Sequence, residues 1–464
     1  MGPRKSVSLL AILLAISPYS ARAQDLTGTY RDTANRLIAA ALADDEGYGR
    51  LAYLCYRIGN RLSGSQGLER AIAWSAEQMK AAGFVNVRTI PVKVPHWVRG
   101  AESARLVAPV ARPLHMLGLG MSVGTPPGGV TADVVAVSDF DQLEALGRQK
   151  VQGKIVLYNQ VYRGYGPTVA YRNSGAARAA ALGAVAVLVR SVTPLAMQIP
   201  HTGTLYYADN QPRIPAAAVS PEDAMMIARW CAEGTPVRVI LEMAAHREPD
   251  ADSADVMGEL PGRERPEEIV DIGGHIDSWD VGQGAQDDGA ALMVSLQAAA
   301  LMKKLGLQPR RTLRVVFWVN EENGSRGGQA YREWVGDRIG NHVAAIEMDG
   351  GAEAPTGFGA GVDEPSMALL RQIAKLLDPI EAGQLVAGGG GEDIRPMTSD
   401  GVPSLSQQNA MVRYFDWHHT EADTLDKVDI EDFRKNLAAM AVMSYVLADM
   451  PERLSQNGAR PQAK

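Results

Sequence analysis

Cysteine is scarce in this chain, which has two cysteines among its 464 residues. Cys55 and Cys231 lie far apart, and neither lies in a recognisable nucleophile setting, which argues against cysteine catalysis. A single disulfide between them and two separate buried thiols are both compatible with the sequence, because sequence alone does not show whether the two side chains meet.

Long apolar runs are also lacking, since nothing after residue 23 is long and apolar enough for a transmembrane helix. The N-terminus differs: Arg4 and Lys5 precede an apolar stretch over residues 6–17, and Ala21-Arg22-Ala23 forms a small-x-small cleavage site. This stretch is too short to span a bilayer, and the cleavage site argues against an uncleaved anchor. The pattern predicts a secretory signal peptide over residues 1–23 and an exported protein, periplasmic or extracellular.

Positive charge is not in excess, with 46 Lys and Arg against 53 Asp and Glu. Removal of residues 1–23 takes away three basic residues and no acid, which lowers the net charge from −7 to −10. A mildly acidic exported protein favours neither nucleic acid nor an anionic membrane as a partner.

The apolar pattern divides the chain into parts. Short β-like runs with few ionisable clusters fill residues 125–245, which predicts an inserted β-rich module. Residues 24–124 and 246–464 would then be the N-terminal part and the main part of one domain. From residue 253 onward, apolar strands alternate with amphipathic helices, which predicts an α/β sheet with helices on both faces.

Each predicted strand of the C-terminal half runs into acids or a histidine. The residues concerned are His275 and Asp277, Glu321 and Glu322, Glu347 and Asp349, and, nearer the C-terminus, His418, His419 and Asp423. In a parallel sheet these strand ends meet at one edge, where uncompensated carboxylates would raise one another's pKa. Divalent cations remove that conflict, and imidazole with carboxylate ligands suits zinc.

Each of these residues also has an ordinary explanation. His275 could be a turn or core histidine, the pair Asp287-Asp288 could open a helix, and His418-His419 could be a surface pair. Such explanations would have to hold at four strand or loop ends at once. The pattern as a whole therefore indicates a catalytic metal site.

Four segments make the prediction more specific: "GGHIDSWDVGQGAQDDGA", "NEENGSRGG", "IEMDGG" and "WHHTEADT". Together they resemble the M28 family of co-catalytic zinc aminopeptidases and carboxypeptidases, and within it the branch that contains carboxypeptidase Q. The likeness extends to "IGNRLSGSQG" and "VKVPHW", and the middle module resembles a protease-associated (PA) domain. The resemblance implies a mixed β-sheet of the phosphorylase/hydrolase-like type, flanked by helices on both faces, with the PA domain inserted.

The resemblance also implies roles for individual residues and two Zn²⁺ ions per chain. His275 and Asp349 would hold one zinc, Glu322 and His419 the other, and Asp287 would bridge both. Glu321 would be the general acid/base. Asp277 would orient His275, Asp288 would shape the turn, and His418 is not a ligand in this pattern.

Three candidate substrate contacts lie near this set. Asp393 and Arg395 belong to a glycine-rich loop, residues 387–404, that resembles one bordering the family's substrate pocket. Tyr414 could donate a hydrogen bond to an oxyanion, although a packed aromatic is the simpler interpretation.

The hypothesis is therefore a secreted or periplasmic di-zinc exopeptidase that acts on dipeptides or short peptides, as a dipeptidase, aminopeptidase or carboxypeptidase. Two other classes are a single-zinc acyltransferase similar to glutaminyl cyclases and a catalytically inactive binding protein with a PA domain. The complete ligand set disfavours both. A homodimer is expected only because the branch that the chain resembles forms one.

Overall fold

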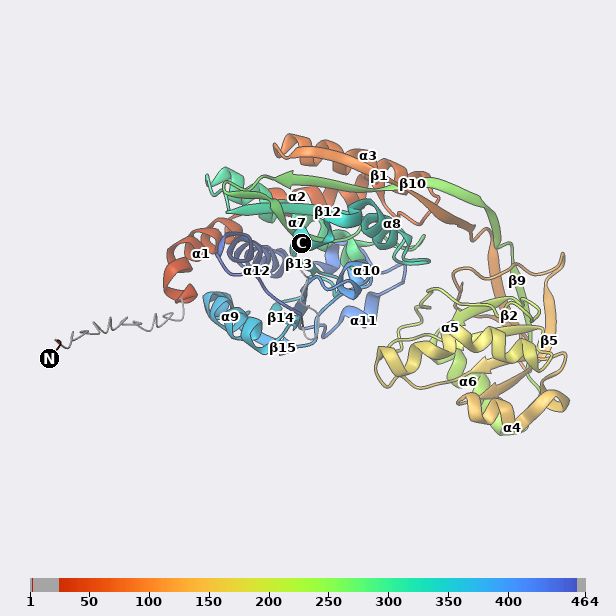
Figure 1. Ribbon diagram of the computed structural model, residues 1–464. Coiled ribbons are helices and arrows are strands. Elements are labelled where there is room, and N and C mark those ends of the chain that lie inside the picture. The colour runs from red at the N-terminus through yellow and green to blue at the C-terminus, as the bar shows by residue number, and fades with distance from the viewer. Residues whose placement is uncertain (1, 3–24, 457–464) are drawn as a thin grey trace.

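The computed structural model describes residues 2 and 25–456, and these form two units that each contain an eight-stranded sheet (Figure 1). We call residues 25–98 with 246–456 the main domain, and residues 99–245 the insert. The predicted signal peptide lies outside the described residues, apart from residue 2. Among residues 25–456, every helix is too short or too polar to cross a membrane.

The sheet of the main domain has the order β1-β10-β12-β11-β13-β16-β14-β15. Its four central strands are parallel, and β1, which contains two prolines, lies at the edge. The strands are β1 (Val85–Val98), β10 (His246–Leu260), β11 (Arg265–His275), β12 (Arg311–Trp318), β13 (His342–Glu347), β14 (Pro355–Gly361), β15 (Gln384–Ala387) and β16 (Ser404–Asn409).

Helices cover both faces of this sheet, which confirms the predicted α/β class. On β12, Val315 and Phe317 join the larger core, while Val316 and Trp318 join a separate core on the opposite face with Tyr331. Successive strand residues therefore pack on opposite sides. The helices are α1 (Leu26–Leu42), α2 (Glu46–Tyr53), α3 (Gln66–Ala81), α7 (Ala290–Lys304), α8 (Arg326–Val335), α9 (Glu364–Ala374), α10 (Arg395–Ser399), α11 (Tyr414–Trp417) and α12 (Ile430–Asp449).

The sheet of the insert has the order β3-β2-β9-β5-β6-β7-β8-β4. Three of its strands precede residue 125, where the sequence pattern places the beginning of the module. Its elements are β2 (Glu102–Ala108), β3 (Arg112–Pro113), β4 (Met116–Gly118), β5 (Val130–Val137), α4 (Phe140–Val151), β6 (Ile155–Tyr158), α5 (Tyr165–Ala181), β7 (Ala186–Arg190), β8 (Ala216–Val219), α6 (Pro221–Ala232) and β9 (Arg238–Met243).

A ribbon of two strands connects the units. Strand β1 pairs with β10 along its whole length, and the last pair is Val98 with His246, so the chain enters and leaves the insert at adjacent positions (Figure 1). The cysteines are not joined: Cys55 packs in the core of the main domain and Cys231 packs against the core of the insert.

A buried polar network connects β11, β13 and α8. Asp271 on β11 lies 2.5 Å from Nδ1 of His342 on β13, and it accepts a hydrogen bond of 2.7 Å from the Tyr331 hydroxyl on α8. Burial alone would raise the pKa of Asp271, but the attraction of His342, with Arg314 and the Tyr331 hydroxyl, outweighs burial and lowers it.

Asp271→Asn should therefore lower the free energy of unfolding by about 3 kcal/mol at neutral pH, because a buried pair loses one partner. The folded pKa of Asp271 lies below the unfolded value of about 3.9, so its contribution is fully present above that value and is lost as the pH falls through the folded pKa. Urea unfolding at several pH values checks both points. Asp252→Asn, which removes an exposed pair with Lys93, is the control and should change stability by less than about 1 kcal/mol.

Candidate metal centre

Asp287 lies between two histidines, with one carboxylate oxygen turned to each. Its Oδ1 is 3.2 Å from Nε2 of His275, and its Oδ2 is 3.2 Å from Nε2 of His419. Asp349 Oδ1 lies 3.5 Å from the same nitrogen of His275, and Glu322 Oε2 lies 3.1 Å from that of His419. The five residues expected to be ligands thus form two groups that share Asp287.

The strand order brings these residues together. His275 is the last residue of β11, Glu322 follows the end of β12, and Asp349 follows the end of β13. Since β11 pairs in parallel with both neighbours, the three strands end at the same edge of the sheet. His419 comes from the loop after α11.

The donor atoms fit bound cations. Oε1 of Glu322 is buried and has no hydrogen-bond partner among the described residues, and Oδ2 of Asp287 has a nearby histidine nitrogen but no well-aligned hydrogen bond. Burying such oxygens is costly unless a cation or a donor faces them. The side chains of His275, Asp287 and Asp349 are close enough together to hold one ion. Nitrogen and carboxylate donors in this arrangement suit zinc.

His418 is buried beside His419, and not exposed as a surface pair would be. The two rings stack with their centroids 3.5 Å apart, and Nε2 of His418 lies 3.5 Å from Oδ2 of Asp287. His418 therefore approaches one of the acids, whereas His419 approaches both Asp287 and Glu322. The side chains of Asp287, His418 and His419 are close enough together to hold one ion.

Arg61 holds the loop that follows His275, a role that the sequence analysis missed. Its buried guanidinium donates to the carbonyl oxygens of Ile276 (2.8 Å), Gln283 (2.7 Å) and Gly284 (2.9 Å). Gly284 has φ +56°, and a Cβ there would lie 2.8 Å from Arg61 Nη2. The glycine therefore permits the close approach of the guanidinium. The available signal was the position of Arg61 inside "IGNRLSGSQG".

Asp423 holds the residues that lead into Asp287. Its carboxylate accepts hydrogen bonds from the backbone N–H groups of Ala285 (3.1 Å), Gln286 (2.8 Å) and Asp287 (3.2 Å). These residues begin a π-helical turn, Ala285–Gly289, just before α7. Three hydrogen bonds to one carboxylate fix the backbone that presents Asp287. Asp423 therefore positions a residue that precedes it by 136 positions in the sequence.

Asp277 differs from the expectation. The resemblance implied that its carboxylate orients His275, but this carboxylate lies 3.8 Å from Nδ1 of the ring. The backbone carbonyl oxygen of Asp277 lies closer to the same nitrogen, at 3.0 Å. The carboxylate instead accepts the N–H groups of Glu321 (3.0 Å) and Glu322 (3.3 Å). Its hydrogen bonds therefore go to these two amides and not to the ring, and they hold the backbone of both glutamates.

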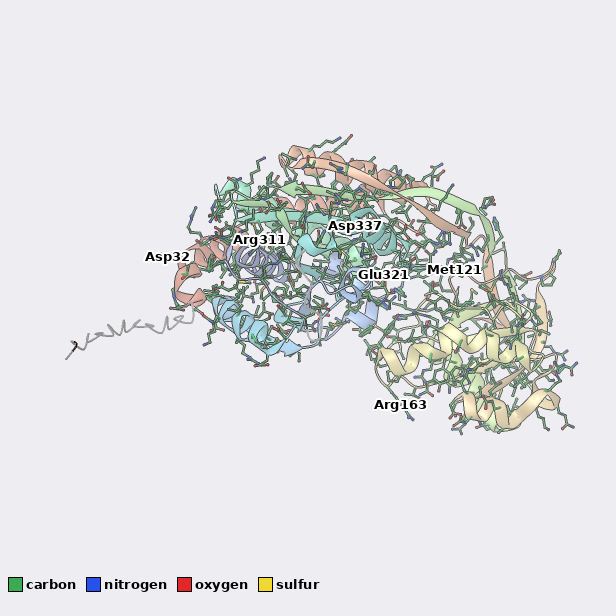
Figure 2. The ribbon with its side chains drawn as sticks, in the orientation of Figure 1. Asp32, Met121, Arg163, Arg311, Glu321 and Asp337 are labelled. Carbon is green, nitrogen blue, oxygen red and sulfur yellow. The ribbon has the colours of Figure 1, made fainter. Side chains whose placement is uncertain are left out.

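A cavity of about 560 Å³ opens beside the acids and is lined by both units. Glu321 lines it, and Figure 2 shows this residue on the side of the main domain that faces the insert. Burial raises the pKa of Glu321 well above its ordinary value, and Asp349 adds to the shift while His275 opposes it. A larger cavity, about 780 Å³, lies within the insert, but none of the clustered acids or histidines lines it.

Two of the three expected substrate contacts line the smaller cavity. Arg395 and Tyr414 do so, and Arg395 is paired with Glu392. Asp393 does not line it, which corrects the expectation for this residue. The residue is 1% exposed, and neither carboxylate oxygen has a hydrogen-bond partner in the described chain. Burial raises the pKa of Asp393 well above its ordinary value, and the negative charge of Glu347 adds to the shift.

Family models and known proteins match most of the chain. Residues 255–444 match the model of peptidase family M28, and residues 130–227 match the model of the PA domain. The chain is 41% identical to carboxypeptidase Q of Homo sapiens, over 92% of this chain and 91% of that protein. It is 42% identical to carboxypeptidase Q of Xenopus laevis over the same shares.

Solved structures agree with these matches. A peptidase M28 precursor from Shewanella amazonensis SB2B superposes with a TM-score of 0.89 at 32% identity, covering 92% of this chain and 98% of that chain. An aminopeptidase from Aneurinibacillus sp. strain AM-1, at 20% identity and a TM-score of 0.63, shares the fold. The chain therefore belongs to peptidase family M28 and is a metallopeptidase that carries a PA domain.

Proposed function

We propose that this protein is an exported di-zinc exopeptidase that hydrolyses dipeptides or other short peptides. The observation that carries the proposal is Asp287, whose two oxygens face two separate histidines at 3.2 Å each. One carboxylate shared by two nitrogen and oxygen donor sets is suited to a pair of cations. The signal-peptide pattern at the N-terminus supports export. The cavity of about 560 Å³ falls within the size range of sites for small ligands.

In this proposal His275 and Asp349 hold one zinc, Glu322 and His419 hold the other, and Asp287 contributes to both. Bound zinc would supply Lewis acidity, which polarises a peptide carbonyl and lowers the pKa of water. The protein contributes the fixed positions of these ligands, because Arg61 and Asp423 together hold the backbone of residues 283–287, which leads into Asp287.

Glu321 moves the proton in the proposed reaction. It takes a proton from the attacking water and gives it to the leaving amine. Its position at the cavity wall, directly beside the proposed ligand Glu322, suits both steps. The Asp277 carboxylate, which binds the backbone of Glu321 and Glu322, directs one side chain to the cavity and the other to His419.

Two cavity residues are proposed to contact the substrate. Burial raises the pKa of the Tyr414 hydroxyl well above its ordinary value, so the hydroxyl stays protonated and can donate to the oxyanion that forms during attack. Arg395 places a positive charge at the cavity wall beside Glu392. The wall therefore carries charges of both signs, which could bind the carboxylate or the amino group at a peptide terminus. The expected homodimer remains a prediction.

A panel of dipeptides with free and blocked termini tests the reaction class. We expect release of free amino acids from unblocked dipeptides, with activity lost when one particular terminus is blocked. The required terminus then identifies an aminopeptidase or a carboxypeptidase, and a need for both identifies a dipeptidase. Cyclisation of an N-terminal glutamine without hydrolysis, or no turnover of any peptide, would contradict the proposal.

Glu321→Gln should reduce kcat by about 10³-fold, because the proton acceptor is lost. It should bind zinc as the wild type does, since Glu321 is not a proposed ligand. Steady-state kinetics with metal analysis of the same sample checks both points. Glu267→Gln, at an exposed position on β11, serves as the matched control and should keep full activity. Full activity of Glu321→Gln with zinc bound would show that another group is the base.

Removal of ligands should affect zinc content unequally. Asp287→Asn should weaken both zinc sites and lower kcat/KM by more than about 100-fold, whereas Asp349→Asn should weaken only one site. Zinc per chain, measured after dialysis against a graded chelator, distinguishes these outcomes. The exposed Asp337→Asn is the control (Figure 2). Two tightly held zinc ions in Asp287→Asn would rule out the shared ligand.

A further inference from the structure

One short segment of the insert reaches the backbone of the metal centre. Residues 201–205, which we call the strap, are all buried. The strap is anchored within the insert: the Thr202 hydroxyl donates to the carbonyl of Gly118 (2.7 Å), and the Gly203 carbonyl accepts the N–H of Gly120 (3.0 Å). It therefore presents a fixed edge of the insert to the main domain.

The strap contacts three backbone carbonyl groups of the main domain. The N–H of Thr202 donates to His419 (3.0 Å), and the Thr204 hydroxyl donates to Glu322 (2.9 Å). Nδ1 of His201 lies 2.7 Å from the carbonyl oxygen of His418. Two of these three acceptors belong to the residues proposed to hold the same zinc, and the third is the neighbour of one of them.

The residues proposed to hold the other zinc are positioned from within the main domain. Among the hydrogen bonds of residues 25–456, none joins the strap to His275, Asp287 or Asp349. The backbone N–H of His275 donates to Asp288 (3.1 Å) and that of Asp287 donates to Asp423 (3.2 Å), both within the main domain. The two halves of the metal centre thus differ in what positions them.

The half that the strap contacts needs external support. His419 has φ +62°, in the left-handed region that a residue with a side chain rarely adopts, and surrounding contacts must maintain that conformation. Arg172 of the insert adds a contact, because its Nη1 lies 3.2 Å from the carbonyl of Thr202 and 3.3 Å from Nδ1 of His419. A Cβ on Gly203 would lie 2.2 Å from Arg172 Cζ, so only glycine allows this packing.

We infer that the strap is a positioning element for one zinc alone, and that it acts by fixing the backbone of Glu322 and His419 from the insert. The inference rests on the proposed two-zinc function. It assigns the insert a part in metal binding, in addition to lining the cavity, and it makes Thr204 the residue of the insert that holds Glu322.

Thr204→Val tests the inference, because valine keeps the shape of threonine and removes the hydroxyl that donates to Glu322. We expect wild type to bind two zinc ions in competition with a chromogenic chelator. Thr204→Val should bind one ion with unchanged affinity and the other about 10- to 100-fold more weakly. Its kcat/KM should fall at limiting zinc and recover when zinc is added in excess. Thr204→Ser, which keeps the hydroxyl, should restore both affinities.

Thr312→Val is the control for a general loss of stability. Thr312 is also buried, and its hydroxyl donates to the Pro266 carbonyl (2.7 Å). It lies at the amino end of β12, whereas the proposed ligands lie beyond the carboxyl ends of the strands. It should leave both zinc affinities unchanged. The inference is overturned if Thr204→Val binds both ions as wild type does, or if it weakens both equally. Wild type that binds a single zinc would instead contradict the proposed function, whatever the variant does.

Discussion

Several carboxylates are buried around Asp287, where solvent does not screen their negative charge. Asp287, Asp288, Glu322 and Asp277 are all buried, and burial raises the pKa of Glu322 to about 7. Such a group of carboxylates is tolerated only where cations or donors face its oxygens. Histidine nitrogens face some of them, backbone amides face others, and a few remain unpaired. Much of the surrounding structure serves to hold these oxygens in place.

The restraints on this site come from distant parts of the chain. Arg61 lies before the first strand, Asp423 follows the last strand, and the strap belongs to the insert. Each acts on backbone groups and not on the proposed ligand side chains themselves. A ligand held through its own backbone keeps its position when the ion leaves, so the unpaired oxygens stay together at the cost of mutual repulsion.

The sequence predicted the parts of the site that depend on local pattern. His275 and Asp349 each come directly after an apolar run, and a parallel sheet brings such strand ends together, so their meeting could be expected. The choice of Glu322 over Glu321 as a ligand, and of His419 over His418, came from the family resemblance. Spacing alone does not distinguish adjacent residues of the same type.

Other features depend on contacts between segments that are remote in sequence. Strand β2 pairs with β9, so Glu102 lies opposite Met243, and nothing in the local pattern around residue 102 indicates that partner. In the sequence alone, Arg61 is an ordinary basic residue in a turn. Its four hydrogen-bond acceptors are backbone carbonyl groups, which have no sequence signature. The bond from Thr204 to Glu322 has the same character.

The pairing of Val98 with His246 has a topological consequence. The two crossings between the units are neighbours in one antiparallel ladder, so a tight turn could join them and leave every strand of the main sheet in place. In its connectivity the main domain is complete without residues 99–245. In its chemistry it is not, because the carbonyl groups of Glu322 and His419 would lose their donors. A module that could be removed from the fold is thus part of the environment of the proposed metal ligands.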